Sequence, residues 1–535
     1  TTQNKGIWPT SEEIQKGASG SLTLHHDGKG MELPKDPSPL YAKMGTNYAT
    51  STNYWFRLSA YDADGETIYS NQALTVKIPE GNEYLGKEEY WSIIDVPYAS
   101  VNAATGNLIV DEDDVSISGR GPGLGMTRTY NSLSTSDGLF GKGWQSDAEI
   151  SIIAQGKEAR FTDEDGTLHI FTKLSDGTYK APTGVYLELS ETADEYILTD
   201  KDQTKIHFRK SDGKLTKMVD GHGNTTTYSY ANGKLVSIID ASGRKLTMEY
   251  NASGKIQKIT DPLNRSITFE YQNGLLTKVT KAGKETTRYE YNEHGRLEKV
   301  YEPTHTEAKA VVNQFIYNGD RISQVIDPEN RIYKLNYDQT KRQLVVIQPN
   351  GRKIQYTFNE AANPIQIIED AGGLNITTSY VYEGNNLVES RDPNDQNAVR
   401  PTETYTYDAN GNVLSVKDQY GTETYKYNKN NDVISETDTE GDTTTIAYDG
   451  LNPVSETDQS GKTSSIAKYD TYGNIIEESN TLGSAANLLS NSGFEQGITA
   501  WNLLRSNDSG QLFEDTNRHH RSLGRKTLKI VTASS

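Results

Sequence analysis

The histidines of this 535-residue sequence are its first candidates for metal binding or proton transfer. They are His25, His26, His169, His207, His222, His294, His305, His519 and His520. None belongs to a His-Glu-x-x-His pattern, and neither adjacent pair has a third ligand at a fixed spacing. The sequence has no cysteine, which excludes disulfides, thiolate metal sites and a cysteine nucleophile. We therefore predict no zinc site.

Acidic residues are the second candidates for chemistry. Asp62-Ala-Asp64-Gly and Asp163-Glu-Asp165-Gly look like the start of calcium loops, but they lack the later ligands and the terminal Glu of an EF-hand. We interpret the acidic run at 111–114 as a solvated loop, with calcium as a minor alternative. With 73 Asp and Glu residues, no single pair is indicated for a glycosidase. The sequence has no Gly-x-Ser-x-Gly elbow, so we predict no active site and no cofactor.

A repeat in the sequence predicts the secondary-structure elements that position these residues. An aromatic residue returns every 20 to 26 positions. These aromatic heads are Phe208, Tyr230, Tyr250, Tyr271, Tyr291, Tyr317, Tyr337, Phe358, Tyr382, Tyr407, Tyr427, Tyr448 and Tyr469. Self-similarity at such a period indicates a repeat architecture in which each unit packs on its neighbours.

Two turn signals divide each repeat into a pair of strands. The first follows the aromatic head and ends in glycine, as at Gly254, Gly295, Gly411 and Gly473. The second reads Asp-x-x-Gly or Asp-x-x-Asn, as at Asp240, Asp261, Asp327, Asp418, Asp438 and Asp458. Asp accepts hydrogen bonds from its own turn, and Gly or Asn adopts a positive φ there. A turn about every ten residues predicts tandem β-hairpins with strands of about six residues.

The strands alternate with a period of two. Tyr-x-Tyr pairs such as Tyr405/Tyr407 and Tyr425/Tyr427 place both rings on one face of a strand. We expect the rings of neighbouring repeats to stack into an aromatic ladder along the sheet. The 33 tyrosines, against 10 phenylalanines and 5 tryptophans, suit an all-β protein of this kind.

The pattern Tyr-Asp/Asn-x-x-Gly followed by Asp-x-x-Gly resembles the YD repeat of Rhs and teneurin proteins. The resemblance implies a long sheet that spirals into a shell, which in bacterial members often holds a C-terminal toxin. Thirteen repeats give about 26 strands and, at ~4.8 Å per strand, a ribbon ~125 Å long. That length makes about one turn of a shell. The predicted fold class is therefore all-β: tandem YD-repeat hairpins in a long curled sheet, a partial Rhs-type shell flanked by β-sandwich-like modules.

Four domains are predicted from the residue patterns along the sequence. Residues 1–85 resemble a fibronectin type III module truncated at its start, and residues 86–150 resemble the domain that precedes the repeats in Rhs-type toxins. The YD-repeat array is expected over 151–480, with divergent hairpins over 150–207 opening the same sheet. Residues 481–535 resemble the incomplete start of a carbohydrate-binding β-sandwich.

The pre-repeat segment contains a glycine-rich run at Gly119–Gly123 and the sequence Phe140-Gly-Lys-Gly-Trp144. The run has neither a following Lys-Ser/Thr nor a G-x-G-x-x-G pattern, so nucleotide binding is disfavoured. We expect its glycines to form tight corners and Trp144 to anchor the segment to the first repeats.

Charge restricts the partners. The formal net charge is −19, which disfavours nucleic acid and anionic membranes as ligands of this sequence. No apolar run reaches the ~18 residues of a membrane span. The chain begins at Thr1 without a signal-peptide pattern, and we interpret it as an internal fragment.

The nearest resemblance within the family is to wall-associated contact-dependent toxins of Gram-positive bacteria. It implies a secreted, cell-wall-associated scaffold that presents or encapsulates a C-terminal toxin, typically a tRNA nuclease, which is absent from this sequence. The implied partners are that toxin segment, a cell-wall polymer or glycan, and a surface receptor. An acidic interior wall would suit a basic nuclease cargo. The alternative is a surface adhesin or glycan-binding repeat protein without a toxin.

Overall fold

The computed structural model describes residues 53–61, 67–77, 85–86, 92–304, 311–393, 400–480, 483–486, 510–520 and 525–532. Two compact units divide the chain after Tyr84, and each is described by itself. In the first unit, β1 (Asn53–Tyr61) and β2 (Thr67–Lys77) form an antiparallel hairpin with a register shift between Arg57 and Ser59. This hairpin lies where the last two strands of the fibronectin-like module are expected. The rest of that module lies outside the described residues.

A single 29-stranded sheet dominates the second unit. Each strand pairs antiparallel with the strands before and after it in the chain, so the strand order is the chain order. In chain order these strands are β14 (Glu188–Glu191), β15 (Glu195–Thr199), β16 (Lys205–Arg209), β17 (Leu215–Val219), β18 (Thr225–Ala231), β19 (Lys234–Ile239), β20 (Lys245–Tyr250), β21 (Ile256–Thr260), β22 (Ser266–Gln272), β23 (Leu275–Thr280), β24 (Thr286–Tyr291), β25 (Leu297–Thr304), β26 (Val312–Asn318), β27 (Arg321–Ile326), β28 (Ile332–Asp338), β29 (Gln343–Ile347), β30 (Lys353–Phe358), β31 (Pro364–Glu369), β32 (Ile376–Glu383), β33 (Asn386–Arg391), β34 (Glu403–Tyr407), β35 (Val413–Lys417), β36 (Thr422–Tyr427), β37 (Val433–Thr437), β38 (Thr443–Asp449), β39 (Asn452–Thr457), β40 (Thr463–Tyr469), β41 (Ile475–Asn480) and β42 (Gly483–Ala486). The prediction of an all-β fold built from tandem hairpins in one long sheet is confirmed.

The remaining strands form small sheets. A five-stranded sheet has the order β3-β4-β5-β6-β9, and a two-stranded sheet pairs β7 with β8. These strands are β3 (Ile93–Val96), β4 (Ala99–Asn102), β5 (Leu108–Ile117), β6 (Leu124–Asn131), β7 (Asp137–Gly138), β8 (Gly141–Lys142) and β9 (Trp144–Ser146), followed by the 3-10 helix η2 (Asp147–Glu149). We call residues 93–149 the inner domain. At the other end of the chain, β43 (Gly510–His520) pairs with β44 (Arg525–Thr532), and the rest of the predicted carbohydrate-binding-like module lies outside the described residues.

Residues 151–180 differ from the prediction. They form a separate four-stranded sheet of β10 (Ser151–Gln155), β11 (Glu158–Thr162), β12 (Leu168–Lys173) and β13 (Tyr179–Lys180). The prediction that the hairpins over 150–207 all belong to the repeat sheet is therefore wrong for this segment. No ladder joins β13 to β14. Pro182 and the positive-φ Gly184 lie in the connection, where proline removes a backbone donor.

The aspartate turns explain why the hairpins are so regular. At Asp261, Oδ1 accepts the backbone N–H groups of Leu263 and Arg265, and Oδ2 accepts Arg265 Nε at 2.7 Å. Asn264 occupies the left-handed position with φ 59°. The same two backbone bonds recur at Asp240, Asp327, Asp438 and Asp458. Each turn therefore satisfies its own backbone donors without help from distant residues.

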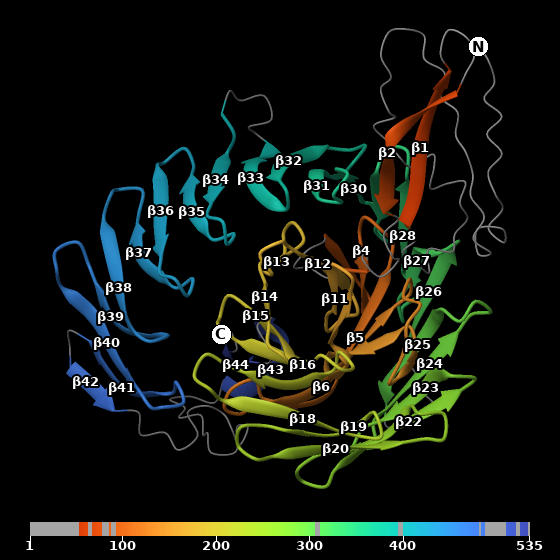
Figure 1. The fold of residues 1–535 in the computed structure, drawn as a ribbon, viewed down its shortest axis with the longest axis horizontal. Helices are drawn as coiled ribbons and strands as arrows, with labels where there is room; N and C mark the ends of the chain where they lie inside the picture. Colours follow the sequence, from red (N-terminus) through yellow and green to blue (C-terminus); the bar gives the residue numbers. More distant parts are fainter. Residues whose placement is uncertain are drawn as a thin grey trace. The chain divides into compact units, whose positions relative to one another are not determined.

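The inner domain packs on one face of the long sheet. Apolar side chains of β4–β6 and β9 share a core with residues of β19–β30, including Ile259, Phe269, Val300 and Phe315. Figure 1 shows β4, β5 and β6 inside the arc of the sheet, beside β22–β27. We call the sheet face that carries this core the inner face. The sheet therefore curves around a folded domain from the same chain.

The long sheet and its connections also contact each other across 200 or more residues. Tyr186 Oη donates to Asn386 Oδ1 at 2.6 Å, and Asn224 Nδ2 donates to the carbonyl of Tyr472 at 3.2 Å. His222 Nε2 lies 2.6 Å from Asn452 Oδ1. These contacts join the connections before β14 and before β18 to β33, to β39 and to the connection after β40. The curl thus completes about one turn, while the sheet order stays open.

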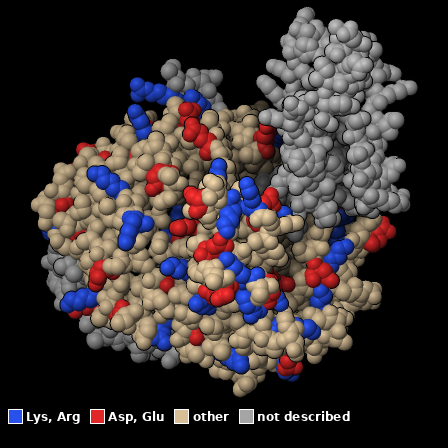
Figure 2. All heavy atoms as spheres, in the orientation of Figure 1, with Lys and Arg blue, Asp and Glu red and all other residues tan. Residues whose placement is uncertain are grey.

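Charged residues are mixed on the surface. Lys, Arg, Asp and Glu are interspersed over the face shown in Figure 2. Within the described ranges, no helix is long and apolar enough to cross a membrane.

Candidate functional site on the inner face of the repeat sheet

The two faces of the long sheet differ in chemistry. On the outer face, Glu–Lys pairs connect neighbouring strands, as between Glu249 and Lys258 at 2.8 Å and between Glu270 and Lys278 at 2.9 Å. The inner face carries the aromatic heads together with the apolar residues of the core. The register assigns each residue to one face because cross-strand partners share a face and alternate residues change face.

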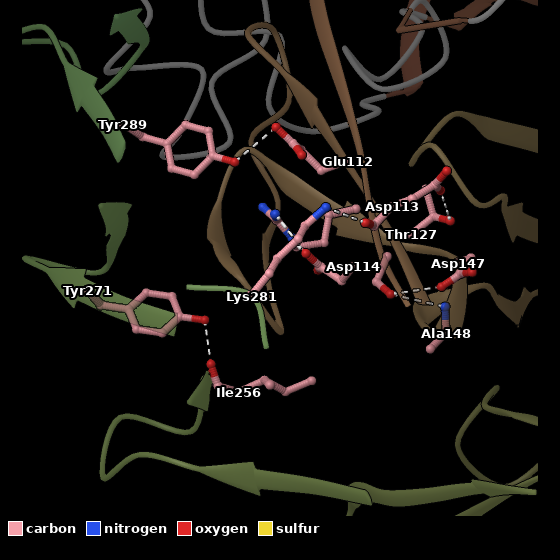
Figure 3. Close-up of polar contacts among 12 residues, drawn as sticks. Glu112, Asp113, Asp114, Thr127, Asp147, Ala148, Ile256, Tyr271, Lys281 and Tyr289 are labelled. Carbon is pink, nitrogen blue, oxygen red and sulfur yellow. Dashed lines mark hydrogen bonds and ion pairs between the residues drawn. The ribbon is translucent and has the colours of Figure 1, made fainter. Parts of the chain in front are cut away.

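Most head tyrosines donate a hydrogen bond to the preceding hairpin. The accepting carbonyl belongs each time to the residue opposite the preceding head, beside the register shift of that hairpin. The pairs are Tyr250 to Leu235, Tyr271 to Ile256, Tyr291 to Leu276, Tyr317 to Leu297, Tyr407 to Leu387, Tyr427 to Val413, Tyr448 to Val433 and Tyr469 to Pro453, at 2.6–2.9 Å. A bulge disrupts the ladder locally, and the phenolic hydroxyl bonds the carbonyl beside it. Figure 3 shows this contact for Tyr271.

The other predicted repeat residues also lie at equivalent positions. Phe208 is fully buried in a second core formed with β10–β12 and β14–β18. Tyr230 and Tyr337 pack against the main core, which contains Phe358, and Tyr382 pairs with Leu387 across its hairpin. The turn glycines Gly254, Gly295, Gly411 and Gly473 all have positive φ.

The predicted ring ladder is wrong. Among the described residues, no two heads of successive repeats form a ring pair; the stacked rings of Tyr356 and Phe358 lie on a single strand. The reason is geometric. Successive heads are two strands apart, about 9.6 Å, whereas interacting rings have centroids within about 7 Å. A Leu or Val of the intervening strand separates them, and the hydroxyl bonds described above connect the repeats instead.

A buried arginine lies at the contact between the inner domain and the sheet. Arg128 on β6 is 1% exposed, and its Nε and Nη2 donate to Asp114 on β5 at 2.5 and 3.0 Å. Its guanidinium lies over the rings of Trp144 at 4.6 Å, Phe269 at 5.6 Å and Tyr289 at 6.0 Å. Phe269 and Tyr289 belong to neighbouring repeats of the sheet. The inner face therefore contributes two of the aromatic rings beside this cation, and the inner domain contributes the cation and its counter-ion.

Trp144 and Tyr130 connect the inner domain to β24 and β25. Trp144 Nε1 donates to Tyr291 Oη at 2.9 Å, and Tyr130 Oη accepts the backbone N–H of Leu297 at 2.8 Å. The rings of Trp144 and Tyr289 meet at 5.3 Å. Trp144 is thus an anchor, as predicted, but it attaches to the fifth of the thirteen repeats rather than to the first ones.

The acidic run at 111–114 is a strand, which corrects its interpretation as a solvated loop. Asp111 and Asp113 accept the hydroxyls of Thr129 and Thr127 on the facing strand at 2.6 and 3.0 Å. Glu112 accepts Tyr289 Oη at 3.2 Å, as Figure 3 shows. The register of β6 places a residue opposite each of the first three acids, and Asp114 lies at the register shift between Asp113 and Val115.

Burial perturbs two further acids behind this strand. Burial raises the pKa of Asp147 to about 7, against hydrogen bonds from the backbone of Thr127 and Ala148 and from Ser146. Burial also raises the pKa of Glu149 to about 7. Both groups lie in the inner domain, so its packing on the sheet is expected to depend on pH.

The inner face changes character after β33. Over β34–β39 it carries Glu403, Glu423, Glu436 and Glu456, and the described residues of these strands place no Lys or Arg on it. Lys417 and Lys426 of the same strands face outward. Tyr425 Oη donates to Glu423 at 3.0 Å, and Tyr405 Oη donates to Glu403. The wall of the late repeats is therefore acidic and rich in tyrosine.

The candidate calcium turn at 163–166 serves the fold. Asp163 Oδ1 accepts the N–H groups of Asp165 and Thr167 at 3.2 and 2.8 Å, and its Oδ2 lies 2.7 Å from His169 Nε2. Within the ranges that the structure describes, no three His, Cys, Asp or Glu side chains are placed to hold a metal ion. Asp62 and Asp64 lie outside these ranges.

Sequence reasoning missed the Arg128 site and the acidic wall. Arg128 has no motif around it, because the two rings that the sheet contributes, Phe269 and Tyr289, come from β22 and β24, more than 130 residues away. The acidic wall had a signal in the sequence. Glu stands two residues before Tyr in both Glu403-Thr-Tyr405 and Glu423-Thr-Tyr425, and alternation places each pair on one face.

Comparison with known proteins identifies two regions of the chain. The family model described as Teneurin YD-shell matches residues 190–313, within the long sheet. A domain of unknown function, DUF6531, matches residues 99–171, which cover most of the inner domain and β10–β12.

Curated relatives match the chain over its whole length. It is 54% identical over 536 residues to the tRNA(Glu)-specific nuclease WapA of Bacillus subtilis subsp. natto, and 53% identical to the tRNA3(Ser)-specific nuclease WapA of Bacillus spizizenii. The chain spans 23% of the length of each of these relatives. Among solved structures, the crystal structure of TcdB2-TccC3 is 10% identical with a TM-score of 0.40, covering 81% of this chain and 34% of that one. A likeness at that score is too distant to add to the argument.

Proposed function

We propose that this chain, a YD-repeat protein related along its whole length to the WapA nucleases, is the non-catalytic scaffold of a longer toxin. Its function is to hold or present a C-terminal toxin segment, which is a tRNA nuclease by analogy with these relatives. The chain matches 23% of the relatives' length, which leaves ample room for such a segment in a parent protein.

The curl of the repeat sheet carries this proposal. Contacts such as Tyr186 with Asn386 return the sheet onto itself after about 200 residues. One folded domain already packs on the inner face of the early repeats. The inner face of the late repeats is acidic, which would be unfavourable for a purely structural core but suits a basic cargo. A tRNA-cleaving domain needs cationic groups to approach phosphates.

The setting of the proposal is contact-dependent competition between cells. The parent would be secreted and associated with a Gram-positive cell wall, with a wall polymer or glycan and a surface receptor as further partners. These elements rest on the family resemblance. The chain is proposed to need no cofactor and to leave catalysis to the toxin segment.

Protease protection tests the scaffold role. The parent chain, with its downstream toxin segment, is digested with trypsin alongside the isolated toxin segment. We expect the segment to be cleaved at least about tenfold more slowly within the parent, because shielded sites open rarely. Equal rates would contradict the scaffold role and favour the adhesin alternative.

Two controls accompany that assay. A parent variant with Gly411→Ala and Gly473→Ala, which disturbs the self-contact of the sheet, should lose part of the protection. The matched variant with Gly243→Ala and Gly441→Ala, at turns with no neighbour within 4 Å, should keep it. Residues 1–535 alone should leave tRNA intact, and cleavage would contradict the non-catalytic assignment.

A further inference from the structure

The late repeats carry aromatic residues at the same two positions that the sheet contributes to the Arg128 site. Phe269 and Tyr289, which lie under the Arg128 guanidinium, each stand two residues before a head tyrosine. Tyr405 and Tyr425 occupy the same place in two later successive repeats, before Tyr407 and Tyr427. In both cases the two rings are 20 residues and one hairpin apart. The same pair of positions that binds a guanidinium in the early repeats therefore recurs in the late repeats.

The carboxylates come from different parts of the chain in the early and the late repeats. In the early repeats, the positions two residues before Phe269 and Tyr289 are Ile267 and Thr287, and Val300 lies opposite Tyr289. These side chains are uncharged, and the inner domain provides Asp114 as the counter-ion of Arg128.

In the late repeats the sheet itself carries the acids. The equivalent positions are Glu403 and Glu423, before Tyr405 and Tyr425, and Glu436, opposite Tyr425. Carboxylates thus replace Ile, Thr and Val at the repeats where the described inner domain supplies no counter-ion. The carboxylates lie on the inner face, whereas Lys417 and Lys426 of the same strands face outward.

The electrostatics of the two tyrosines favour a nearby cation. Burial, together with the neighbouring carboxylates Glu423 and Glu436, raises the pKa of Tyr425 to about 12. Burial and the hydrogen bond to Glu403 raise the pKa of Tyr405 to about 12 as well. An ammonium or guanidinium group over these rings would oppose both shifts and neutralise part of the wall.

We infer that the Tyr405–Tyr425 region of the inner face binds arginine or lysine side chains of a basic, extended segment of the cargo. The inference rests on the proposed scaffold function and specifies what the scaffold holds. Each cation would lie over a tyrosine ring, as Arg128 does over Tyr289, and pair with a glutamate of the same repeat.

The repeat spacing sets the spacing of the basic residues. Equivalent positions of successive repeats are two strands apart, about 9.6 Å. A peptide in the extended polyproline II conformation has three residues per turn and rises about 3.1 Å per residue, so every third side chain lies on the same side, about 9.3 Å apart. A segment crossing the strands with a basic residue at every third position would place one cation in each repeat.

The test uses a defined peptide and the whole chain. A labelled nonapeptide with arginine at every third position and Gly-Ser between is titrated with residues 1–535 by fluorescence anisotropy. In the control peptide, citrulline replaces arginine, which removes the charge and keeps the shape. We expect binding of the arginine peptide only. If residues 1–535 bind the two peptides equally or bind neither, the inference is wrong.

Two triple variants distinguish binding at this site from non-specific attraction to the negative charge of the whole chain. The inner-face variant Glu403→Gln/Glu423→Gln/Glu436→Gln should weaken binding by about tenfold or more, as expected for the loss of several charge contacts. The outer-face variant Glu249→Gln/Glu270→Gln/Glu290→Gln loses the same charge and should change affinity by less than about twofold. Equal losses would reduce the effect to non-specific attraction and overturn the inference.

A single substitution tests the ring. Tyr425→Leu removes the aromatic face and should weaken binding several-fold, whereas Tyr425→Phe keeps the ring and should bind like the unmodified chain. If Tyr425→Leu binds as tightly as the unmodified chain, the cation does not lie over the ring. Circular dichroism of each variant confirms that the sheet is intact.

The failure of this inference is distinguishable from failure of the scaffold role. If the peptide does not bind but the parent chain still protects its toxin segment from trypsin, the cation site is rejected and the scaffold role stands. If protection in the parent also depends on the three inner-face glutamates, both are supported.

Discussion

Replacing Gly411 tests whether the curl of the sheet is held by the contact between the segment before β14 and the repeats around β33–β35. Gly411 has φ 70°, and a Cβ added there would lie 2.2 Å from Cζ of Tyr186. The Tyr186 ring is held by its hydrogen bond to Asn386 at 2.6 Å and lies 4.7 Å from Lys201 Nζ. In Gly411→Ala the ring must move away, so both contacts are lost.

The expected magnitude follows from these contacts. An alanine at positive φ costs about 1–2 kcal/mol by itself. Loss of the hydrogen bond adds about 1 kcal/mol, and loss of the cation–π contact adds about 0.5–1 kcal/mol. Gly243→Ala is the matched control, because Gly243 has φ 79° and no atom lies within 4 Å of its added Cβ. The excess cost of Gly411→Ala over this control is therefore about 1.5–2 kcal/mol.

Hydrogen exchange measures this difference locally, which suits a repeat array that opens in parts. An excess of 1.5–2 kcal/mol corresponds to exchange about 10 to 30 times faster, since 1.4 kcal/mol is tenfold. We expect this acceleration at residues 183–187 and 384–388 in Gly411→Ala, and little change there in Gly243→Ala. If both variants accelerate exchange equally at these segments, the strain of the turn explains the effect. The argument for closure through Tyr186 would then be wrong.

Three further outcomes are expected. Tyr271→Phe should lower the free energy of unfolding by about 1 kcal/mol, because the carbonyl of Ile256 loses its hydrogen-bond donor. An unchanged urea midpoint would show that water replaces the hydroxyl. Arg128→Met should lower the free energy of unfolding by about 3–5 kcal/mol, because Asp114 is left buried without its partner. Adding Asp114→Leu should recover most of this loss of stability. A double variant as unstable as the sum of the single variants would contradict this explanation. The raised pKa of Asp147 means that the folded state keeps a proton that the unfolded state releases. The free energy of unfolding should therefore fall as pH rises from about 4 to 7, by up to about 1.4 kcal/mol per pH unit, and then level off. Asp147→Asn should flatten this dependence in urea titrations at pH 4.5 to 7.5, and parallel curves for the two proteins would refute it.

The repeat array was predictable because its causes are local. Each aspartate turn bonds its own backbone, as Asp261 does, and each short strand pairs with the strand next to it in the chain. The period of the heads and the alternation of each strand therefore predict strand order and the faces of most side chains. The ring ladder failed because the strand between two heads separates their rings.

The position of the inner domain was not predictable. Its contacts join residues such as Trp144 and Tyr291, 147 positions apart, and no local pattern marks the partner. For the same reason the acidic run at 111–114 looked solvated: its partners on β6 and on the long sheet become visible only when the strands are paired.

The sequence by itself determined the hairpins, their antiparallel order and the acidic composition of the late repeats, since these depend on turn chemistry and on alternation along one strand. The tertiary structure decided which face packs on the inner domain, where the sheet meets itself and which acids lie on the inner face of the late repeats. Those outcomes depend on the twist accumulated over many strands and on packing between segments more than 100 residues apart. Short-range patterns do not encode them.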